Sequence, residues 1–246
     1  MLTHGSLFSG IGGFDLAFTS LCISTKWMVE IDRYCRAVLE KNFPGVPIHA
    51  DIRNAGGRNL EKVDIISGGF PCQPFSQAGK KKGTKDSRFL WPEMFRVVRE
   101  LRPRWVVAEN VRGLLSIDGG RIHHQICSEL EAEGYEVRTL LLPACAFGAP
   151  QRRDRVWILA HSEGIDLRTW NGREDRDNAA VEGAAIRRLP NWQAEPGVRR
   201  LVDGCPQQAR RNKSLGNAVV PQIAAWIGAG IVRHEALNDH AKGEQD

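Results

Sequence analysis

The chain has 246 residues, of which 42% are hydrophobic and 26% charged, and 34 Lys and Arg against 29 Asp and Glu give a formal net charge of +5. This length allows one full hydrophobic core and a small second lobe, which excludes a disulfide-stabilised miniprotein, and the charge permits a polyanionic partner without requiring one. The six cysteines include no C-x-x-C pair and the histidines no zinc spacing, so we expect reduced thiols and no metal. Neither a signal-peptide pattern nor a run of about 18 apolar residues is present, so we expect a soluble, cytoplasmic protein.

Residues 1–160 alternate short apolar segments with amphipathic ones. This alternation predicts an α/β fold in which helices cover both faces of a parallel sheet. The expected strands are Ser6–Phe8, Trp27–Ile31, Val63–Ser67, Trp105–Ala108, Val137–Leu142 and Val156–Ala160, with a further strand before Asp51. The expected helices are Asp32–Asn42, Leu90–Leu101 and Ile122–Ala132.

The character of the sequence changes after Ala160. Long apolar runs are missing from 161 to 212, where Arg, Asp, Gly and Trp are interspersed, and this predicts a loop-rich insert. Leu215–Ile231 is apolar again with helical spacing, so the chain is expected to return to the first lobe there. The expected units are a main domain over 1–160, a small insert over 161–212, a returning segment over 213–234 and a polar tail over 235–246.

A glycine-rich stretch, LFSGIGGF over Leu7–Phe14, lies where the first strand is expected to pass into a helix. Backbone can approach a ligand closely at such a junction, although many of these stretches are only tight turns. Glu30 and Asp51 follow the next two strands, and in an open parallel sheet the ligand crevice lies beyond the carboxyl ends of the strands. The Glu30 carboxylate suits a ribose diol and the Asp51 carboxylate an adenine amine; the alternative is two solvated loop acids.

Cys72 lies in GGFPCQPFS between two prolines, which fix the backbone and hold the thiol at a loop after the fourth strand. Most lone cysteines are buried small hydrophobes, but this setting is typical of a nucleophile. Glu109 ends the next strand, and an acid beside a nucleophile indicates a reaction centre more than a helix cap. Arg153 and Arg155 alternate in QRRDRVW, so on an extended chain they share one face that suits a phosphate or a carbonyl oxygen; the alternative is a solvated edge strand.

The motifs LFSGIGGF, GFPCQPFS, GKKKGTKDSRFLW, ENV, QRRDRVW and LGNAVVP occur in an order that resembles the DNA cytosine-carbon-5 methyltransferases. The similarity extends over residues 5–160 and 214–231, and Pro-Cys-Gln followed by Glu-Asn-Val is specific to this family and its RNA-acting relative. The resemblance implies the Rossmann-like doubly wound sheet of S-adenosylmethionine-dependent methyltransferases, with 161–212 as a small target-recognition insert. It also implies a monomer that acts on double-stranded DNA, with no metal and no membrane.

The resemblance assigns residues to three sites. The catalytic residues would be Cys72, Glu109, Arg153 and Arg155. The S-adenosylmethionine site would comprise Phe8, Gly10, Ile11, Gly13, Glu30, Asp51, Ile52, Pro71, Leu90, Asn217, Ala218 and Val219. The DNA contacts would be Gln73, Ser76, Lys80, Lys81, Lys82, Lys85 and Arg88, in a loop that closes over the substrate; elsewhere such a Lys run is usually only a solvated surface.

The implied chemistry follows from the weak nucleophilicity of cytosine carbon 5. The Cys72 thiolate would add to carbon 6 while a protonated Glu109 bonds ring nitrogen 3, and carbon 5 would then attack the sulfonium methyl group. Loss of the carbon 5 proton would release the cysteine. Glu109 must hold a proton near neutrality, which burial favours. Arg155 would contact the base carbonyl, Arg153 the site or the backbone, and the target nucleotide would flip out of the duplex.

The insert departs from the family pattern. Family members ordinarily carry a sizeable target-recognition region, whereas 161–212 is short and RRLVDGCPQQARRNKSLG replaces the usual motif before GNAVVP. Compact phage and prophage enzymes are similar in this region, so we expect the cytoplasm of a bacterial or phage-infected cell and a short recognition site. Two alternatives remain open: a DNA-binding pseudoenzyme that methylates nothing, and the same chemistry on tRNA.

Overall fold

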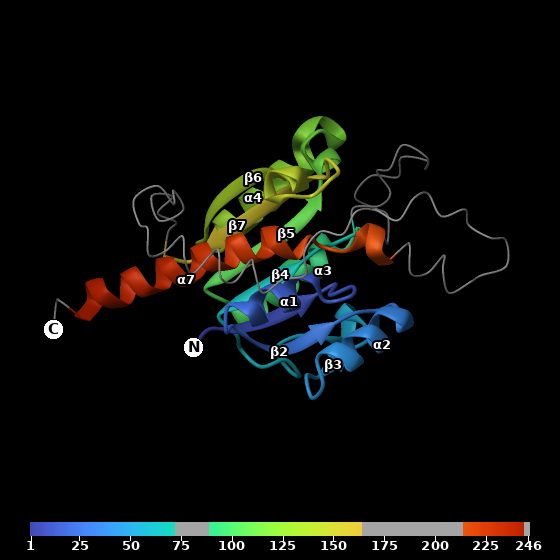
Figure 1. Ribbon diagram of the computed structural model, residues 1–246. Coiled ribbons are helices and arrows are strands. Elements are labelled where there is room, and N and C mark those ends of the chain that lie inside the picture. Colours follow the sequence, from blue (N-terminus) through green and yellow to red (C-terminus); the bar gives the residue numbers. More distant parts are fainter. Residues whose placement is uncertain (72–88, 164–213, 244–246) are drawn as a thin grey trace.

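A mixed sheet forms the centre of the fold in the computed structural model, which describes residues 1–71, 89–163 and 214–243 (Figure 1). Its strands are β1 Thr3–Leu7, β2 Ser24–Val29, β3 Ile48–His49, β4 Ile65–Gly68, β5 Trp105–Val111, β6 Glu136–Pro143 and β7 Asp154–His161. Their order across the sheet is β3-β2-β1-β4-β5-β7-β6. The predicted α/β fold is confirmed, and a strand does precede Asp51.

One strand corrects the expectation of a parallel sheet. β7 runs antiparallel to both of its neighbours, β5 and β6, whereas β1 to β5 pair in parallel. The physical reason is the length of the connection. Only residues 144–153 join β6 to β7, and a parallel crossover needs about a dozen residues or more.

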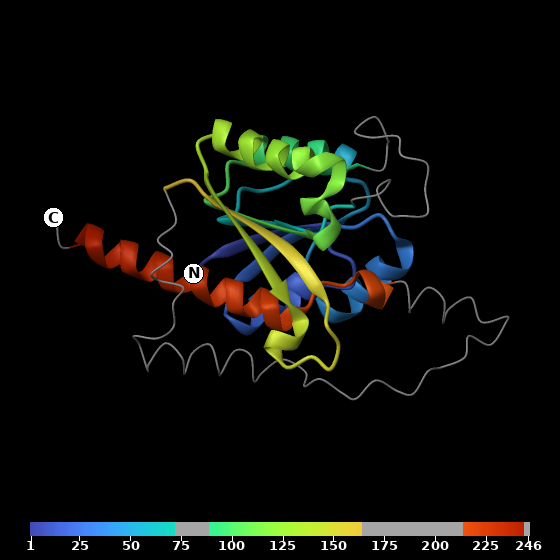
Figure 2. The same cartoon turned by 90° about the horizontal axis from the view of Figure 1, so that it is seen from above.

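Helices cover both faces of the sheet (Figure 2). They are α1 Gly13–Ser20, α2 Arg33–Asn42, α3 Trp91–Leu101, α4 Arg121–Ala132 and α7 Pro221–Gly243, with short 3-10 helices at η1 Ile52–Asn54, η3 Arg112–Leu115, η4 Ile117–Gly120 and η5 Ala144–Phe147. On one face, Phe14 of α1 shares a core with Ile223 of α7. On the other, Met94 of α3 shares a core with Ile126 of α4. The predicted doubly wound arrangement is therefore confirmed.

Local sequence signals explain where the helices begin and end. The Asp32 side chain caps α2 by accepting hydrogen bonds from the backbone N–H groups of Tyr34 and Cys35, at 2.8 and 3.1 Å. α3 carries Pro92 in its first turn and ends at Leu101, and the next residue, Arg102, caps the helix with a left-handed φ of 51°. The three predicted helices are confirmed, with each start shifted by a single residue.

β5 shows how the core positions a functional residue. Trp105 and Val107 belong to the core under α1 and α7, whereas Val106 and Ala108 belong to the core under α3 and α4. All four are 0% exposed, because successive side chains of a central strand alternate between two covered faces. Burial of each large apolar side chain stabilises the fold by roughly 1.5–3 kcal/mol. The first polar residue after this run is Glu109, near the carboxyl end of the strand.

A buried polar network crosses β1. His4 lies with Nδ1 3.0 Å from Thr25 Oγ1 and Nε2 2.8 Å from Ser67 Oγ, and Ser6 Oγ donates to Asp15 Oδ2 at 3.1 Å. His4 and Asp15 are both 0% exposed. Burial lowers the pKa of His4 to about 3 and raises the pKa of Asp15 to about 7. Both side chains are therefore neutral in mildly acidic solution.

α7 is long and apolar, and it lies within the fold. Ser214–Asn238 is long and apolar enough to cross a membrane, and an 18-residue window within it has a mean hydropathy of 1.5. Ile223 and Ile227 are nevertheless completely buried in the core shared with α1, so we interpret α7 as a core helix. It continues to Gly243, into the predicted polar tail. Glu235, in that tail, is buried and accepts a hydrogen bond from Trp105 Nε1 at 2.7 Å.

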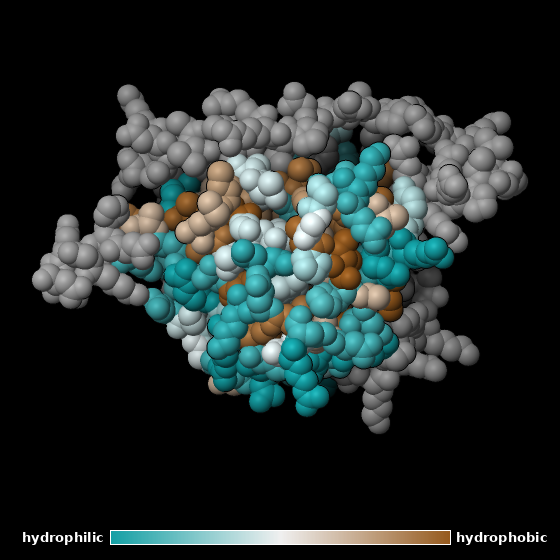
Figure 3. Space-filling model, turned by 90° about the horizontal axis from the view of Figure 1, so that it is seen from below, coloured by the Kyte–Doolittle hydropathy of each residue, from teal (hydrophilic) through white to brown (hydrophobic). Residues whose placement is uncertain are grey.

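The β3 edge of the sheet is short. β3 has only two residues, both half-buried. Seen from below, hydrophilic side chains cover most of the described surface on this side, with hydrophobic side chains in smaller areas between them (Figure 3). A short edge strand in polar surroundings limits pairing with the sheet of another molecule.

Candidate functional site

Parallel strands carry the predicted site residues to one edge of the sheet. Phe8 follows β1, Glu30 follows β2, Gly69 follows β4, and Glu109 lies near the end of β5. β1 lies between β2 and β4, so the chain turns in opposite directions on its two sides, and ligand crevices open at such switch points. A cavity of about 320 Å³ lies at this point, lined by Phe8, Glu30 and Gly69 among others.

This strand-end cavity contains most of the predicted cofactor residues. Its lining includes Phe8, Gly10, Glu30, Asp51, Ile52, Pro71, Leu90 and Asn217. The other predicted cofactor residues, Ile11, Gly13, Ala218 and Val219, line a second cavity of about 640 Å³ beside α1. The volume of the strand-end cavity is within the range of about 300–1,000 Å³ typical of small-molecule sites. The structure thus brings the two predicted acids to one cavity.

The glycine-rich loop between β1 and α1 has an unusual backbone. Phe8, Gly10 and Gly12 have φ angles of 53°, 56° and 88°, in the left-handed region that glycine adopts most readily. At Gly13 glycine is required by space, because an added Cβ would lie 2.6 Å from the carbonyl oxygen of Val219. The loop and the returning segment therefore meet backbone to backbone.

The two predicted cofactor acids are held in different ways. Glu30 is 9% exposed, and its two carboxylate oxygens accept hydrogen bonds from the backbone N–H groups of Gly10 at 2.7 Å and Asp32 at 2.8 Å. Asp51 accepts from the N–H of Arg53 at 3.0 Å and lies 3.5 Å from its guanidinium. Both carboxylates can accept further hydrogen bonds, which fits a ligand with hydroxyl or amine donors.

Glu109 is a buried acid with an arginine partner. The β5–β7 register pairs Glu109 with Trp157, which places Arg155 diagonally opposite on the same face. Arg155 Nε donates to Glu109 Oε1 at 2.9 Å. Burial raises the pKa of Glu109 to about 7, against the opposing effect of the Arg155 and Arg153 charges. A carboxyl group with this pKa can hold or release a proton near neutrality.

The chain that leads to Cys72 passes next to Glu109. An added Cβ on Gly69 would lie 3.3 Å from Glu109 Oε2. Asn110 Nδ2 donates to the carbonyl oxygen of Phe70 at 2.9 Å, which fastens this chain to β5. The residues just before Cys72 are therefore held beside the buried acid. Outside the described residues lie Cys72 itself and the predicted DNA contacts Gln73, Ser76, Lys80, Lys81, Lys82, Lys85 and Arg88.

Two residues near the site had no role in the sequence-based prediction. Asn110 is 4% exposed, and its side-chain oxygen also accepts from the N–H of Val111 at 2.9 Å. The sequence feature that could have identified Asn110 is its position directly after Glu109. Arg36 Nη1 donates to the carbonyl oxygen of Glu30 at 3.0 Å, a contact for which the sequence pattern carries no signal.

Arg153 and Arg155 contact different parts of the site. Arg153 Nη2 donates to the carbonyl oxygens of Gly216 and Ala218, both at 2.8 Å. These two residues flank Asn217, which lines the strand-end cavity. Arg155 instead contacts the carboxylate of Glu109. The pair was predicted to share one face of an extended strand, and both charges do act on Glu109, although Arg153 bonds to the segment that lines the strand-end cavity and Arg155 to the acid.

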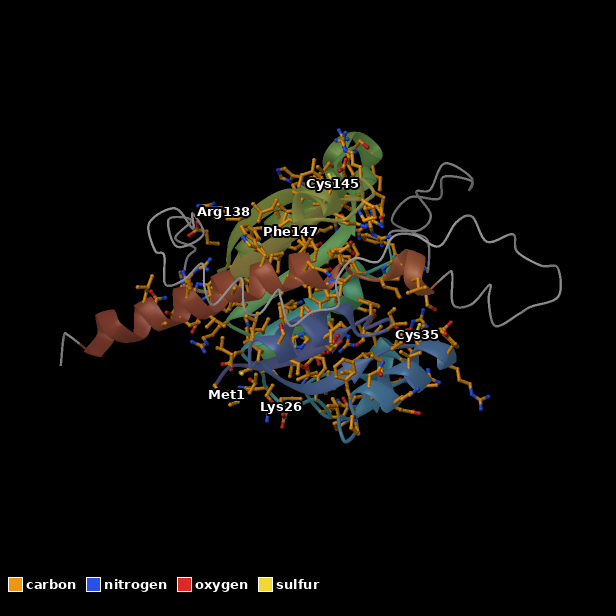
Figure 4. The ribbon with its side chains drawn as sticks, in the orientation of Figure 1. Met1, Lys26, Cys35, Arg138, Cys145 and Phe147 are labelled. Carbon is orange, nitrogen blue, oxygen red and sulfur yellow. The ribbon has the colours of Figure 1, made fainter. Side chains whose placement is uncertain are left out.

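The described cysteines are free thiols, at Cys22, Cys35, Cys127 and Cys145. Figure 4 shows Cys35 on α2 and Cys145 at the connection between β6 and β7, in different parts of the molecule. Cys35 lines the strand-end cavity, and burial raises the pKa of its thiol, which makes it a weaker nucleophile at neutral pH. Within residues 1–71, 89–163 and 214–243, no group of three or more His, Cys, Asp or Glu could hold a metal ion.

Sequence comparisons give a consistent result. Residues 2–197 match the family model described as C-5 cytosine-specific DNA methylase. The Type II methyltransferase M1.ScrFI of Lactococcus lactis subsp. cremoris is 41% identical over 155 residues, which cover 62% of this chain and 40% of that protein. The Type II methyltransferase M.HhaI of Haemophilus parahaemolyticus is 34% identical over 165 residues, covering 67% and 50%. The chain thus spans half the length of these relatives or less.

Solved structures share the fold. A DNA modification methyltransferase encoded within an E. coli prophage matches with a TM-score of 0.59 and 27% identity, over 69% of this chain and 50% of that one. The Dnmt2 methyltransferase of S. pombe matches with a TM-score of 0.67 over 97% of this chain and 100% of that one. At 16% identity, this second likeness shows the fold alone.

Proposed function

Because the chain belongs to the C-5 cytosine-specific DNA methylase family, we propose that it transfers a methyl group from S-adenosylmethionine to carbon 5 of cytosine in double-stranded DNA. The observation that carries the proposal is the buried Glu109, whose pKa is raised to about 7, beside the chain that leads to Cys72. Gly69 lines the strand-end cavity and also faces the Glu109 carboxyl group. The cofactor site and the acid are therefore neighbours.

The residues of the strand-end cavity fit S-adenosylmethionine. Glu30 and Asp51 offer carboxylate oxygens to the ribose hydroxyls and the adenine amine, and Phe8, Ile52 and Leu90 offer apolar contacts to the rings. When bound, the cofactor would supply an electrophilic methyl group on its sulfonium centre. The backbone contacts of Glu30 with Gly10 and Asp32 hold its carboxylate at the cavity in advance of binding.

Cys72 would be the nucleophile and Glu109 the acid. The Cys72 thiolate forms a bond to cytosine carbon 6, and the displaced electrons make carbon 5 nucleophilic. Protonated Glu109 donates a hydrogen bond to ring nitrogen 3 and stabilises this electron distribution. After carbon 5 takes up the methyl group, a base removes its proton, the sulfur–carbon 6 bond breaks and the ring is restored. Arg155 orients Glu109 and offers its remaining N–H groups to the base carbonyl.

The target carbon is hidden inside duplex DNA, so the nucleotide must leave the stack at a cost of a few kcal/mol. Lys80, Lys81, Lys82 and Lys85 would bind phosphates around the flipped base, which predicts an affinity that falls as the salt concentration rises. The proposed location is the cytoplasm of a bacterial or phage-infected cell, where the substrate DNA is present.

The test is a methyl-transfer assay with purified protein, labelled S-adenosylmethionine and double-stranded DNA of mixed sequence, with tRNA as a parallel substrate. We expect DNA labelling that Cys72→Ser abolishes. The matched control is Cys22→Ser, because Cys22 is exposed and precedes β2 at the opposite edge of the sheet. Full labelling by Cys72→Ser would refute the nucleophile assignment. Labelling of tRNA alone would change the substrate, and labelling of neither would favour the pseudoenzyme.

The covalent step has its own test. DNA that carries 5-fluorocytosine cannot lose the carbon 5 substituent as a proton, so the enzyme should remain bonded to carbon 6. Mass spectrometry of the digested complex should find the nucleotide on the peptide that contains Cys72. An adduct on another cysteine, or methylation of ordinary DNA without any trapped adduct, would contradict the mechanism.

A further inference from the structure

Residues 214–219, which we call the cofactor wall, form the side of the strand-end cavity contributed by the returning segment. Ser214 and Asn217 line the cavity. The carbonyl oxygen of Val219 would lie 2.6 Å from a Cβ on Gly13, and Val219 Cγ2 would lie 3.8 Å from a Cβ on Gly69. The cofactor wall therefore touches both the glycine-rich loop and the chain that leads to Cys72.

Arg153, the residue before β7, holds the cofactor wall next to the start of that strand. Its two hydrogen bonds, each 2.8 Å long, go to the carbonyl oxygens of Gly216 and Ala218. These residues lie on either side of Asn217, so the guanidinium holds the backbone on both flanks of a cavity-lining residue. Both bonds come from the same terminal nitrogen, Nη2, whose two N–H groups are fixed in the guanidinium plane.

The three arginines at positions 152, 153 and 155 contact different partners. Arg155 Nε donates to Glu109 at 2.9 Å. Arg152 is exposed and pairs with Asp154 at 3.1 Å. Arg153 lies between them in the sequence and donates its two hydrogen bonds to the cofactor wall. Because Nη2 of Arg153 donates to two backbone carbonyls, these contacts hold the backbone of the cofactor wall in place.

We propose that Arg153 is a positioning residue for the cofactor. Its two hydrogen bonds hold residues 216–218 in the conformation that binds S-adenosylmethionine, and they fix this segment next to the strand that carries Arg155. The inference rests on the proposed function. Without the two bonds, the cofactor wall has more backbone freedom, and part of the binding energy is used to order it. Cofactor affinity then falls, while Glu109 keeps its direct contact with Arg155.

The test compares Arg153→Met with Arg152→Met and Arg155→Met in the full chain. Titration calorimetry measures the Kd for S-adenosylhomocysteine without DNA, and steady-state assays measure kcat and the KM for S-adenosylmethionine. We expect Arg153→Met to raise Kd and KM by about 10- to 100-fold, from the loss of two hydrogen bonds with a charged donor. At pH 6, where Glu109 is protonated in both proteins, the kcat at saturating cofactor should stay within about threefold of the parent. The alkaline limb should move to higher pH, because the Arg153 charge that is removed lowers the pKa of Glu109. Arg152→Met should bind like the parent, and Arg155→Met should change kcat and its pH profile.

The outcomes separate the alternatives. If Arg153→Met binds S-adenosylhomocysteine as tightly as the parent, or loses kcat with an unchanged KM, Arg153 acts on the base or the DNA and the inference is overturned. If that variant does not fold, Arg153→Gln keeps a polar side chain that is too short to reach the two carbonyls; a raised Kd supports the inference and a parental Kd overturns it. A parent that binds neither cofactor form refutes the proposed function, which is a different result.

Discussion

Replacing Asp15 by Asn should make the stability of the fold depend steeply on pH. In the parent, Asp15 has its pKa raised from 3.8 to about 7. The folded state keeps a proton that the unfolded chain releases, so stability falls as the pH rises through this window. His4 has its pKa lowered from 6.5 to about 3. The unfolded chain takes up a proton that the folded state excludes, so stability falls as the pH drops through that window.

The two effects cancel where the windows overlap. Each amounts to about 1.4 kcal/mol per pH unit, so between about pH 4.5 and 6.5 the pair contributes a nearly flat profile. Asp15→Asn leaves the His4 slope alone, and the free energy of unfolding should fall by about 2–3 kcal/mol as the pH drops across that interval. His4→Gln leaves the Asp15 slope alone and should lose a similar amount as the pH rises.

Urea unfolding followed by tryptophan fluorescence at several pH values measures these slopes. The quantity to compare is the difference in unfolding free energy between each variant and the parent, because other titrating groups then cancel. Asn keeps an oxygen that can accept from Ser6, so the substitution removes the ionisation with little change in shape. If the unfolding free energy of both variants changes with pH in the same way as that of the parent, the two side chains titrate as they do in water and the reasoning fails.

Three further changes address the site and the core. Because the proposed mechanism needs protonated Glu109 together with the Cys72 thiolate, kcat/KM should rise with pH up to the Glu109 pKa of about 7 and then level off and fall; Glu109→Gln should lower the rate and let kcat/KM go on rising towards the thiol pKa of about 8.5, and a parental kcat/KM that still rises tenfold per pH unit between pH 7 and 8 would contradict the role. Gly13→Ala should weaken S-adenosylhomocysteine binding at least about tenfold in calorimetry, since the new Cβ would lie 2.6 Å from the backbone oxygen of Val219; parental affinity would show that the loop can yield. Gly5→Ala should lower the unfolding free energy by about 1–3 kcal/mol, because its Cβ would lie 2.0 Å from the Trp27 ring; an unchanged urea midpoint would count against the packing.

The parts of the fold and site that the sequence predicted share one physical basis. Apolar runs become buried strands, and the first polar residues after them appear at the carboxyl edge of the sheet. Glu30, Asp51 and Glu109 all follow this rule, and the structure places the first two at the strand-end cavity. The burial that raises the pKa of Glu109 also follows from its place at the end of a central strand.

The parts that the sequence did not predict depend on contacts between distant residues. Arg153 bonds to Gly216 and Ala218, which are 63 and 65 residues away, and no local pattern reports such a partner. The antiparallel direction of β7 depends on the length of its connection rather than on its composition. The Arg153–Arg155 pattern was visible, but alternation along a strand shows only which side chains share a face and not what each one reaches.

The reversed direction of β7 also limits how the predicted insert over 161–212 could be exchanged. β7 starts at the edge of the sheet where Arg155 meets Glu109 and ends at His161, paired with Trp105 at the opposite edge. Ser214, where the described chain resumes, borders the strand-end cavity. Any connector that joins these two points must recross the sheet, a distance on the order of 25 Å for a strand of this length. A grafted linker shorter than about eight residues could not close that span, which sets a lower limit for minimal chimaeras of this domain.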